Sequence, residues 1–98
     1  MKRVMLTYRV KADQAEENER LIKQVFKQLL RQLPEGIQYS VYKQSDGVSF
    51  VHIAAFENKA ADHLFTALPA FKDFRDAIKD RCDEQPVTVY VEELGAYY

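Results

Sequence analysis

The imidazole of His52 is the side chain in this sequence best suited to acid–base chemistry, because it interrupts an otherwise apolar run from Val51 to Phe56. A histidine in such a setting can act as a base or hold a ligand near neutral pH. The alternative is a structural role, in which His52 forms hydrogen bonds across a dimer or to a neighbouring strand. His63 is a second imidazole, which we place at the rim of a short helix, and the same two roles are open to it.

Three further polar side chains could act together with His52. Asn18 lies one turn before Ile22, on the side of a predicted helix that meets the sheet, so its amide could orient a substrate carbonyl or bond a strand end. Tyr8 and Tyr39 are predicted to face the helices, where their hydroxyls can donate to a ligand or simply reach water from the core. We therefore take His52 as the candidate base, with Asn18 and Tyr8 as the groups that would orient a substrate oxygen.

The other reactive groups form no pattern typical of a metal, nucleotide or nucleophile site. The two histidines have no Asp, Glu or Cys at ligand spacing, so the sequence predicts no metal. Cys82 is the only cysteine and has no neighbouring histidine, so we expect it to pack rather than react. No GxSxG, P-loop or GxGxxG motif occurs, and no cofactor is predicted. Arg9 is expected to neutralise an acidic ligand or to pair with Glu92 or Glu93.

Four segments alternate as strands do. They comprise residues 4–10, 37–44, 50–56 and 87–92. The Ser45–Gly47 turn carries the Asp-Gly signal of a tight hairpin and joins the second segment to the third. The third segment is apolar at both parities, which is typical of a central strand. We assign Val51, Ile53 and Ala55 to its helix side, and Phe50, His52, Ala54 and Phe56 to a cavity or a subunit contact.

The first predicted helix follows the first strand. Asp13 is expected to cap it, with Glu16 completing a capping box. Its apolar residues recur at three- and four-residue spacing from Leu21 to Leu33, which indicates one buried stripe. The sequence Pro34–Gly36 should end it, because proline cannot continue a helix and glycine accepts the left-handed turn that follows.

The second helical region starts at Lys59, restarts with Pro69 in its first turn, and is expected to break between Asp83 and Pro86. The resulting order is strand, helix, strand, strand, helix, strand. This order predicts an α+β, ferredoxin-like βαββαβ fold in a single domain over residues 1–98. Right-handed crossovers would place both helices on one face of a four-stranded antiparallel sheet, with the first and third strands in the middle.

The other face of this sheet is predicted to be rich in aromatic side chains. We expect it to carry Phe50, Phe56, Tyr42 and Tyr90 beside Thr7, Arg9, Ser40, His52 and Thr88. Aromatic groups at this density should not remain in water over a whole sheet face. We therefore predict a homodimer in which the two sheets face each other, that is, a dimeric α+β barrel.

Composition narrows the classes of partner and the compartment. Fourteen Lys and Arg against fifteen Asp and Glu leave a net charge of −1 over 98 residues, which favours neither nucleic acid nor an anionic membrane as a partner. No apolar run approaches the roughly 18 residues of a membrane span, and the first strand does not read as a signal peptide. A lone cysteine suits a reducing compartment, so a cytoplasmic protein is expected.

The chain resembles the dimeric α+β barrel superfamily, and within it the small antibiotic-biosynthesis-monooxygenase domains. The resemblance rests on the opening "VMLTYRVK", the hairpin and strand "DGVSFVHIAAFEN", the broken helix "LPAFKDF" and the final valine-rich strand. It implies a cleft between helices and sheet. Enzymes of this kind resemble cofactor-independent oxygenases of electron-rich aromatic compounds, haem-degrading proteins or small isomerases.

The chain departs from the oxygenase pattern at three places. Such relatives often carry Trp at the end of the third strand and histidines in the following helical segment. Here the strand ends in Phe56, no Trp occurs, His63 lies about two residues from the expected place, and Ala70 stands where a second His often falls. An axial haem ligand therefore cannot be transferred to this chain.

These observations predict a monooxygenase-like domain for cofactor-independent oxidation or isomerisation of a small aromatic or carbonyl compound. The alternative is a non-catalytic module of the same fold that binds a small molecule or serves assembly.

Overall fold

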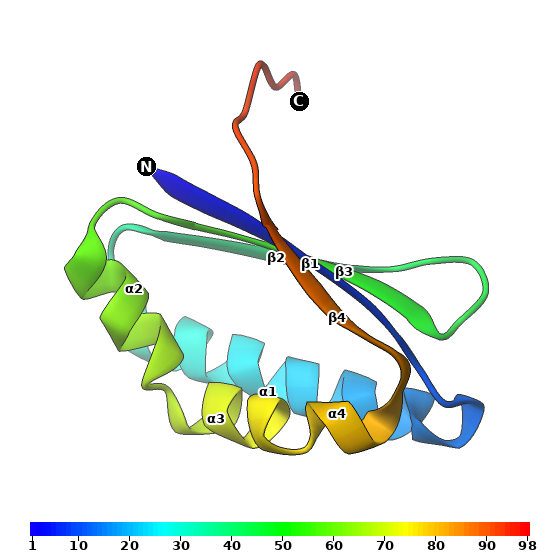
Figure 1. The fold of residues 1–98 in the computed structure, drawn as a ribbon. Coiled ribbons are helices and arrows are strands. Elements are labelled where there is room, and N and C mark those ends of the chain that lie inside the picture. Colours follow the sequence, from blue (N-terminus) through cyan, green and yellow to red (C-terminus); the bar gives the residue numbers. More distant parts are fainter.

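The computed structural model describes residues 1–98 as one antiparallel sheet covered on one side by helices (Figure 1). The elements in chain order are β1 (Lys2–Val10), a 3-10 turn (Ala12–Gln14), α1 (Ala15–Gln32), β2 (Ile37–Lys43), β3 (Ser49–Phe56), α2 (Lys59–Thr66), α3 (Pro69–Asp76), α4 (Ile78–Arg81) and β4 (Cys82–Tyr90). The strand order is β2-β3-β1-β4, with β3 and β1 in the middle. This arrangement confirms the predicted ferredoxin-like fold.

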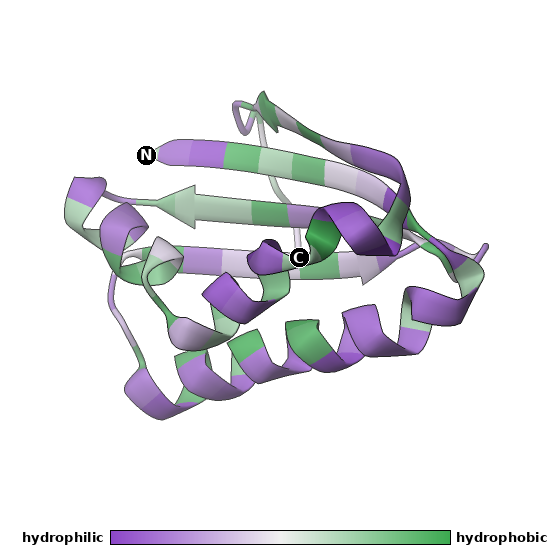
Figure 2. Ribbon diagram, turned by 60° about the horizontal axis from the view of Figure 1, so that its bottom comes forward, coloured by the Kyte–Doolittle hydropathy of each residue, from purple (hydrophilic) through white to green (hydrophobic).

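The helices cover the opposite face of β3 from the one predicted. Phe50, His52, Ala54 and Phe56 are all buried beneath the helices, whereas Val51 and Ile53 keep partial exposure on the other face. The assignment was wrong because β3 is apolar at both parities, so alternation alone does not identify the inner side. Figure 2 shows the helices in alternating purple and green, as expected of segments with one buried stripe.

The start of α1 also differs from the prediction. Asp13 lies inside the 3-10 turn and makes no capping bond, and the N-cap position is occupied by Gln14, whose side chain does not cap either. The predicted end is correct to within a turn. The helix stops at Gln32, and Leu33 adopts a left-handed conformation with φ 48° while its N–H donates to the carbonyl of Leu29.

The predicted hairpin between β2 and β3 is confirmed, and its turn is held by one carboxylate. Asp46 accepts hydrogen bonds from the backbone N–H groups of Val48 and Ser49 and from the Ser49 hydroxyl. These bonds hold the pKa of Asp46 below its ordinary value. Gly47 has φ +79°, a conformation that glycine adopts without steric cost. The turn fixes the register that places Tyr39 beside Ala54 and Val41 beside His52.

The predicted break before the last strand is wrong in position. Pro69 does open α3, as predicted, but β4 begins directly at Cys82, and the residues from Asp83 to Pro86 belong to it. Proline is tolerated there because β4 lies at the edge of the sheet, where a missing N–H breaks no ladder bond. The pairing of β4 with β1 is irregular around Arg9, which accommodates the early start.

The first turn of α2 provides a measure of local stability. The Asn58 side chain accepts a hydrogen bond from the N–H of Ala61 at 2.9 Å, as an N-cap residue does. Asn58→Ala should therefore lower the free energy of unfolding by about 1 kcal/mol, as measured by urea denaturation. Asn58→Asp retains an acceptor at this position and should cost much less. Equal losses in the two variants would contradict a capping role.

Candidate functional site

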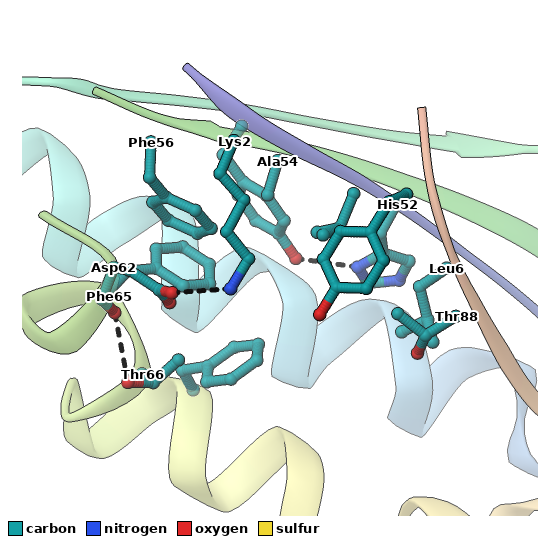
Figure 3. Close-up of a pocket in the computed structure, with 13 residues that line it drawn as sticks. Lys2, Leu6, His52, Ala54, Phe56, Asp62, Phe65, Thr66 and Thr88 are labelled. Atoms are coloured by element: carbon teal, nitrogen blue, oxygen red, sulfur yellow. Dashed lines mark hydrogen bonds and ion pairs between the residues drawn. The ribbon is translucent and has the colours of Figure 1, made fainter. Parts of the chain in front are cut away.

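A cavity of about 220 Å³ lies between the inner face of the sheet and helices α2 and α3 (Figure 3). Its walls are mostly apolar and aromatic: Leu6, Ala54, Phe56, Phe65 and Phe71. An apolar cavity of about 150 Å³ can hold benzene. The volume therefore suits one substituted ring or a carbonyl compound of similar size.

The exposed lining residues of the cavity mark its mouth: Lys2, Thr88 and Tyr90. The Lys2 ammonium bonds the Asp62 carboxylate at 2.8 Å, as the dashed line in Figure 3 shows, and lies 5.6 Å from the centre of the Tyr90 ring. This ion pair links the start of β1 to α2 across the opening. The only charged groups that border the cavity therefore neutralise each other at its edge.

His52 forms the polar part of the wall and is held from both ring nitrogens. Its Nε2 lies 2.6 Å from the Tyr8 hydroxyl, and its Nδ1 lies 2.8 Å from the Tyr39 hydroxyl. The three groups come from β3, β1 and β2, and the register pairs Tyr8 with Phe50 and Tyr39 with Ala54, so the two hydroxyls reach His52 from either side along β3. The imidazole is 4 % exposed, so these hydroxyls replace water as its partners.

The hydrogen-bonded chain continues from Tyr8 to the far side of the core. Asn18 Nδ2 donates to the Tyr8 oxygen at 2.9 Å, and Arg81 Nε donates to Asn18 Oδ1 at 3.1 Å. Arg81 is itself 4 % exposed, and its Nη2 donates to the carbonyl oxygen of Phe74 at 2.7 Å. Every buried side-chain polar atom in the molecule has a partner. A continuous buried chain thus runs from Arg81 through Asn18, Tyr8 and His52 to Tyr39.

Burial sets the protonation states along this chain. It lowers the pKa of His52 to about 3, so the imidazole is neutral at pH 7. It raises the pKa values of both Tyr8 and Tyr39, so both hydroxyls keep their protons. Burial also lowers the pKa of Arg81, and nearby groups, chiefly Tyr8, act in the opposite direction. At neutral pH the chain is a set of neutral donors and acceptors with one cation at its inner end.

The structure brings together all three of the predicted site residues, but in two positions. His52 borders the cavity, whereas Tyr8 and Asn18 lie behind it and do not line the space. Tyr39, considered from the sequence as a ligand donor, does border the cavity. Asn18 and Tyr8 therefore act on the cavity only through the imidazole.

The remaining candidates lie elsewhere. His63 is exposed on α2 and lines a separate open pocket beside Lys2, whose lining residues are mostly polar. Cys82 is buried at the start of β4, and burial raises the pKa of its thiol. Arg9 pairs with Asp83 at 2.9 Å and Glu84 at 3.3 Å, so the predicted pairing with Glu92 or Glu93 is wrong. The cause is the early start of β4, which places its first residues beside Arg9.

Both the sequence and the fold of this protein have known counterparts. The profile of the antibiotic biosynthesis monooxygenase family matches residues 1–77, which is more than half of the chain. The chain belongs to this family. No curated protein matches the sequence.

Solved structures share the fold of this monooxygenase-family chain at low identity. A Nitrosomonas europaea protein assigned to the antibiotic biosynthesis monooxygenases superposes with a TM-score of 0.80 at 18% identity, covering 97% of this chain and 100% of its own. Rv0793 from Mycobacterium tuberculosis gives 0.78 at 13% identity, covering 99% and 98%. A Deinococcus radiodurans protein assigned to the same enzymes gives 0.71 at 20% identity, covering 100% and 99%. At these identities the likeness establishes the fold alone.

The family domain has no grouping of three or more His, Cys, Asp or Glu side chains that could hold a metal ion. None of its helices is long and apolar enough to cross a membrane.

One residue of the buried hydrogen-bonded chain, Arg81, is not predicted by the sequence. Arg81 stands in the charged run Lys79–Arg81, and nothing in that run distinguishes the one side chain that turns inward.

Proposed function

We propose that this monooxygenase-family domain binds a small aromatic or carbonyl compound in the cavity and catalyses its oxidation or isomerisation without a cofactor. The observation that carries the proposal is the combination of an aromatic-walled cavity with one polar wall, formed by His52 and Tyr39. A ring would lie against Phe65 and Phe71, and its oxygen would lie against the polar wall. Membership of the family supports the reaction class.

Both reactions begin in the same way. Loss of a proton from a phenol or from a carbon next to a carbonyl gives a phenolate or enolate, whose oxygen carries negative charge. Isomerisation returns the proton at another carbon. Oxidation passes electrons from this anion to dioxygen, the co-substrate that the cavity must admit; one oxygen atom enters the ring and the other leaves as water, so that a phenol and O2 give a quinone and water. In the role predicted from the sequence, His52 is the base. Because the hydroxyls of Tyr8 and Tyr39 occupy both ring nitrogens, a proton could reach it only through Tyr39.

A non-catalytic binding module is the second candidate, and one observation favours it. Both nitrogens of His52 are already bonded and burial lowers the pKa of the imidazole to about 3, which suits a structural histidine better than a base. Under this reading the cavity holds a ligand that leaves unchanged.

A single variant distinguishes the two candidates. We expect a thermal-shift screen to find stabilisation by small phenols or quinones rather than by flavins or haem, and dioxygen uptake or a change in the ligand spectrum to report turnover. His52→Gln should then reduce turnover by about 100-fold, an effect typical of losing either an acid–base group or a correctly placed oxyanion donor, while the oligomeric state is retained. Absence of turnover with every stabilising ligand, together with unchanged binding in His52→Gln, would support the binding module instead.

We also propose that the chain forms a homodimer through the face of the sheet that the helices leave bare (Figure 1). The aromatic residues expected on this face lie elsewhere, except Tyr42, because Phe50 and Phe56 face the helices and Tyr90 borders the cavity. Two rows of paired side chains cross the outer face of the sheet. From β2 to β4 they are Tyr42, Val51, Thr7 and Val87, and Ser40, Ile53, Met5 and Val89.

The character of these rows supports a second copy as the occupant. Five of the eight side chains are aliphatic, and Val87 and Val89 are 57% and 39% exposed. The two rows contain no charged side chain, and Arg3 and Arg9 share this face only beyond them. A flat patch without charge can face its own copy across a twofold axis without opposing like charges.

A further inference from the structure

Donor and acceptor can be assigned for each hydrogen bond in the buried chain by starting from Arg81. Arginine has donors only, so Asn18 must turn its Oδ1 towards Arg81 Nε, at 3.1 Å. The Asn18 amide then points its Nδ2 at Tyr8, and the Tyr8 oxygen accepts this bond at 2.9 Å. Arg81 therefore determines the orientation of the next two groups.

Tyr8 must donate its own proton to His52. The hydroxyl is buried and has two polar neighbours, Asn18 Nδ2, which is a donor, and His52 Nε2, at 2.6 Å. If Nε2 carried a hydrogen, the Tyr8 oxygen would face two donors and its own proton would lack an acceptor, at a cost of about 1–3 kcal/mol. Nε2 is therefore the acceptor.

A neutral imidazole that accepts at Nε2 carries its hydrogen on Nδ1. Nδ1 then donates to the Tyr39 oxygen at 2.8 Å, the only polar partner of that hydroxyl within the protein. The Tyr39 hydroxyl proton has no acceptor among the buried hydrogen-bonded side chains. Tyr39 borders the cavity beside His52, and Figure 3 shows the hydrogen bond that His52 makes there. The free proton thus faces the ligand space.

From this chain of donors we propose that Tyr39 is the residue that binds the ligand oxygen, as a donor, and that the ligand presents a phenolate, an enolate or a strongly polarised carbonyl to it. The inference deepens the proposed function and assigns Tyr39 an oxyanion-stabilising role. Tyr8, Asn18 and Arg81 are positioning residues. A base would need the opposite polarity, with Nδ1 free to accept, so the buried chain favours stabilisation of the anion over proton removal by His52.

Other polar groups of the cavity are less available. The Lys2 ammonium is engaged by Asp62 at the mouth, and the Thr66 hydroxyl bonds the carbonyl oxygens of Asp62 and His63 in its own helix. Burial raises the pKa of Tyr39, which keeps its proton in place for donation at neutral pH. Thr88 and Tyr90 carry hydroxyls on the exposed part of β4, outside the buried chain, and Tyr90 serves as the matched control.

The tautomer of His52 tests the inference without any ligand. In the ¹⁵N NMR spectrum of imidazole-labelled protein at pH 7, we expect the His52 signals of a neutral ring with hydrogen on Nδ1. Only two histidines occur, so His63→Gln identifies the signals of His52. Hydrogen on Nε2 would overturn the role of Tyr39 as donor and would leave the base role of His52 standing.

Binding of two matched probes tests the ligand class. 4-Nitrophenolate and nitrobenzene share a ring, but only the first offers an anionic oxygen. We expect the wild-type protein to bind 4-nitrophenolate about tenfold more tightly, the equivalent of one hydrogen bond to a charged group. Tyr39→Phe should lose this preference, whereas Tyr90→Phe should keep it within twofold.

Equal affinity of the wild-type protein for the two probes, or no binding of 4-nitrophenolate, would overturn the proposed ligand class. A preference that survives in Tyr39→Phe would overturn the assignment to Tyr39. Neither result depends on turnover. A protein that shows the expected tautomer and probe preference but transforms no compound would instead contradict the proposed enzymatic function alone.

Discussion

Ile53→Glu should convert a dimer of this chain into monomers and raise the dissociation constant by about a thousandfold, the equivalent of roughly 4 kcal/mol. Ile53 lies in the middle of the bare sheet face, paired with Met5 on β1 and Ser40 on β2. A carboxylate at this position would face an apolar surface, and the single interface of a twofold dimer would contain two of them. Its desolvation would not be offset by any cation in the two central rows.

The measurement is sedimentation velocity over a range of micromolar concentrations. Leu30→Glu is the matched control, because it makes the same chemical change at a side chain that is 73% exposed on α1, on the helical layer. This variant should sediment as the wild-type protein does. Wild-type protein that is monomeric throughout this range would remove the proposed dimer, and an Ile53→Glu dimer of wild-type affinity would move the interface to another surface.

The free energy of unfolding should fall by about 2 kcal/mol between pH 7 and pH 5 on account of His52 alone. In the folded protein burial lowers the pKa of His52 to about 3, whereas an unfolded histidine titrates near 6.5. Between these values the unfolded chain binds a proton that the folded chain does not. The contribution of His52 is therefore fully present above about pH 6.5 and is lost progressively as the pH falls below it.

Urea denaturation of the wild-type protein and of His52→Gln at both pH values measures this effect. The variant will be less stable at pH 7, because it alters the bonds to Tyr8 and Tyr39, but its stability should decline by about 2 kcal/mol less on acidification. The lowered pKa values of Asp46 and Glu17 act from ordinary values of 3.8 and 4.5, so their loss falls mainly below pH 5 and is common to both proteins. Identical declines in the two proteins would show that His52 protonates freely in the fold.

The fold could be predicted from local patterns, whereas the inner face of β3 could not. Alternation, the Asp-Gly turn and the Pro69 start depend on neighbouring residues, and the structure confirms the elements that they indicate. Which face of β3 packs against the helices depends on which neighbouring residues of β1 and β2 share that face. The register settles this question by aligning His52 with Leu6 on β1 and Val41 on β2, both of which point towards the helices.

The candidate site shows the same limit. His52, Asn18 and Tyr8 could each be selected from residue type and position, but their connection could not. Tyr8 and His52 are 44 residues apart, and Asn18 and Arg81 are 63 apart. A buried arginine leaves no local signal, because its neighbours Lys79 and Asp80 are exposed and the run looks solvated. Because Asn18 and Tyr8 stand between Arg81 and His52 in the buried chain, they do not line the cavity as direct ligand contacts would.

The buried chain from Arg81 to Tyr39 joins α4, α1, β1, β3 and β2, which span most of the sequence. Contacts of such long range require the loops between them to close first, which costs chain entropy before any bond forms. The hydrogen bonds from Arg81 to Tyr39 are thus completed only when the sheet and helices have already assembled. These hydrogen bonds therefore form after the folding transition state and stabilise the native state. Removing them should mainly increase the unfolding rate and change the folding rate little.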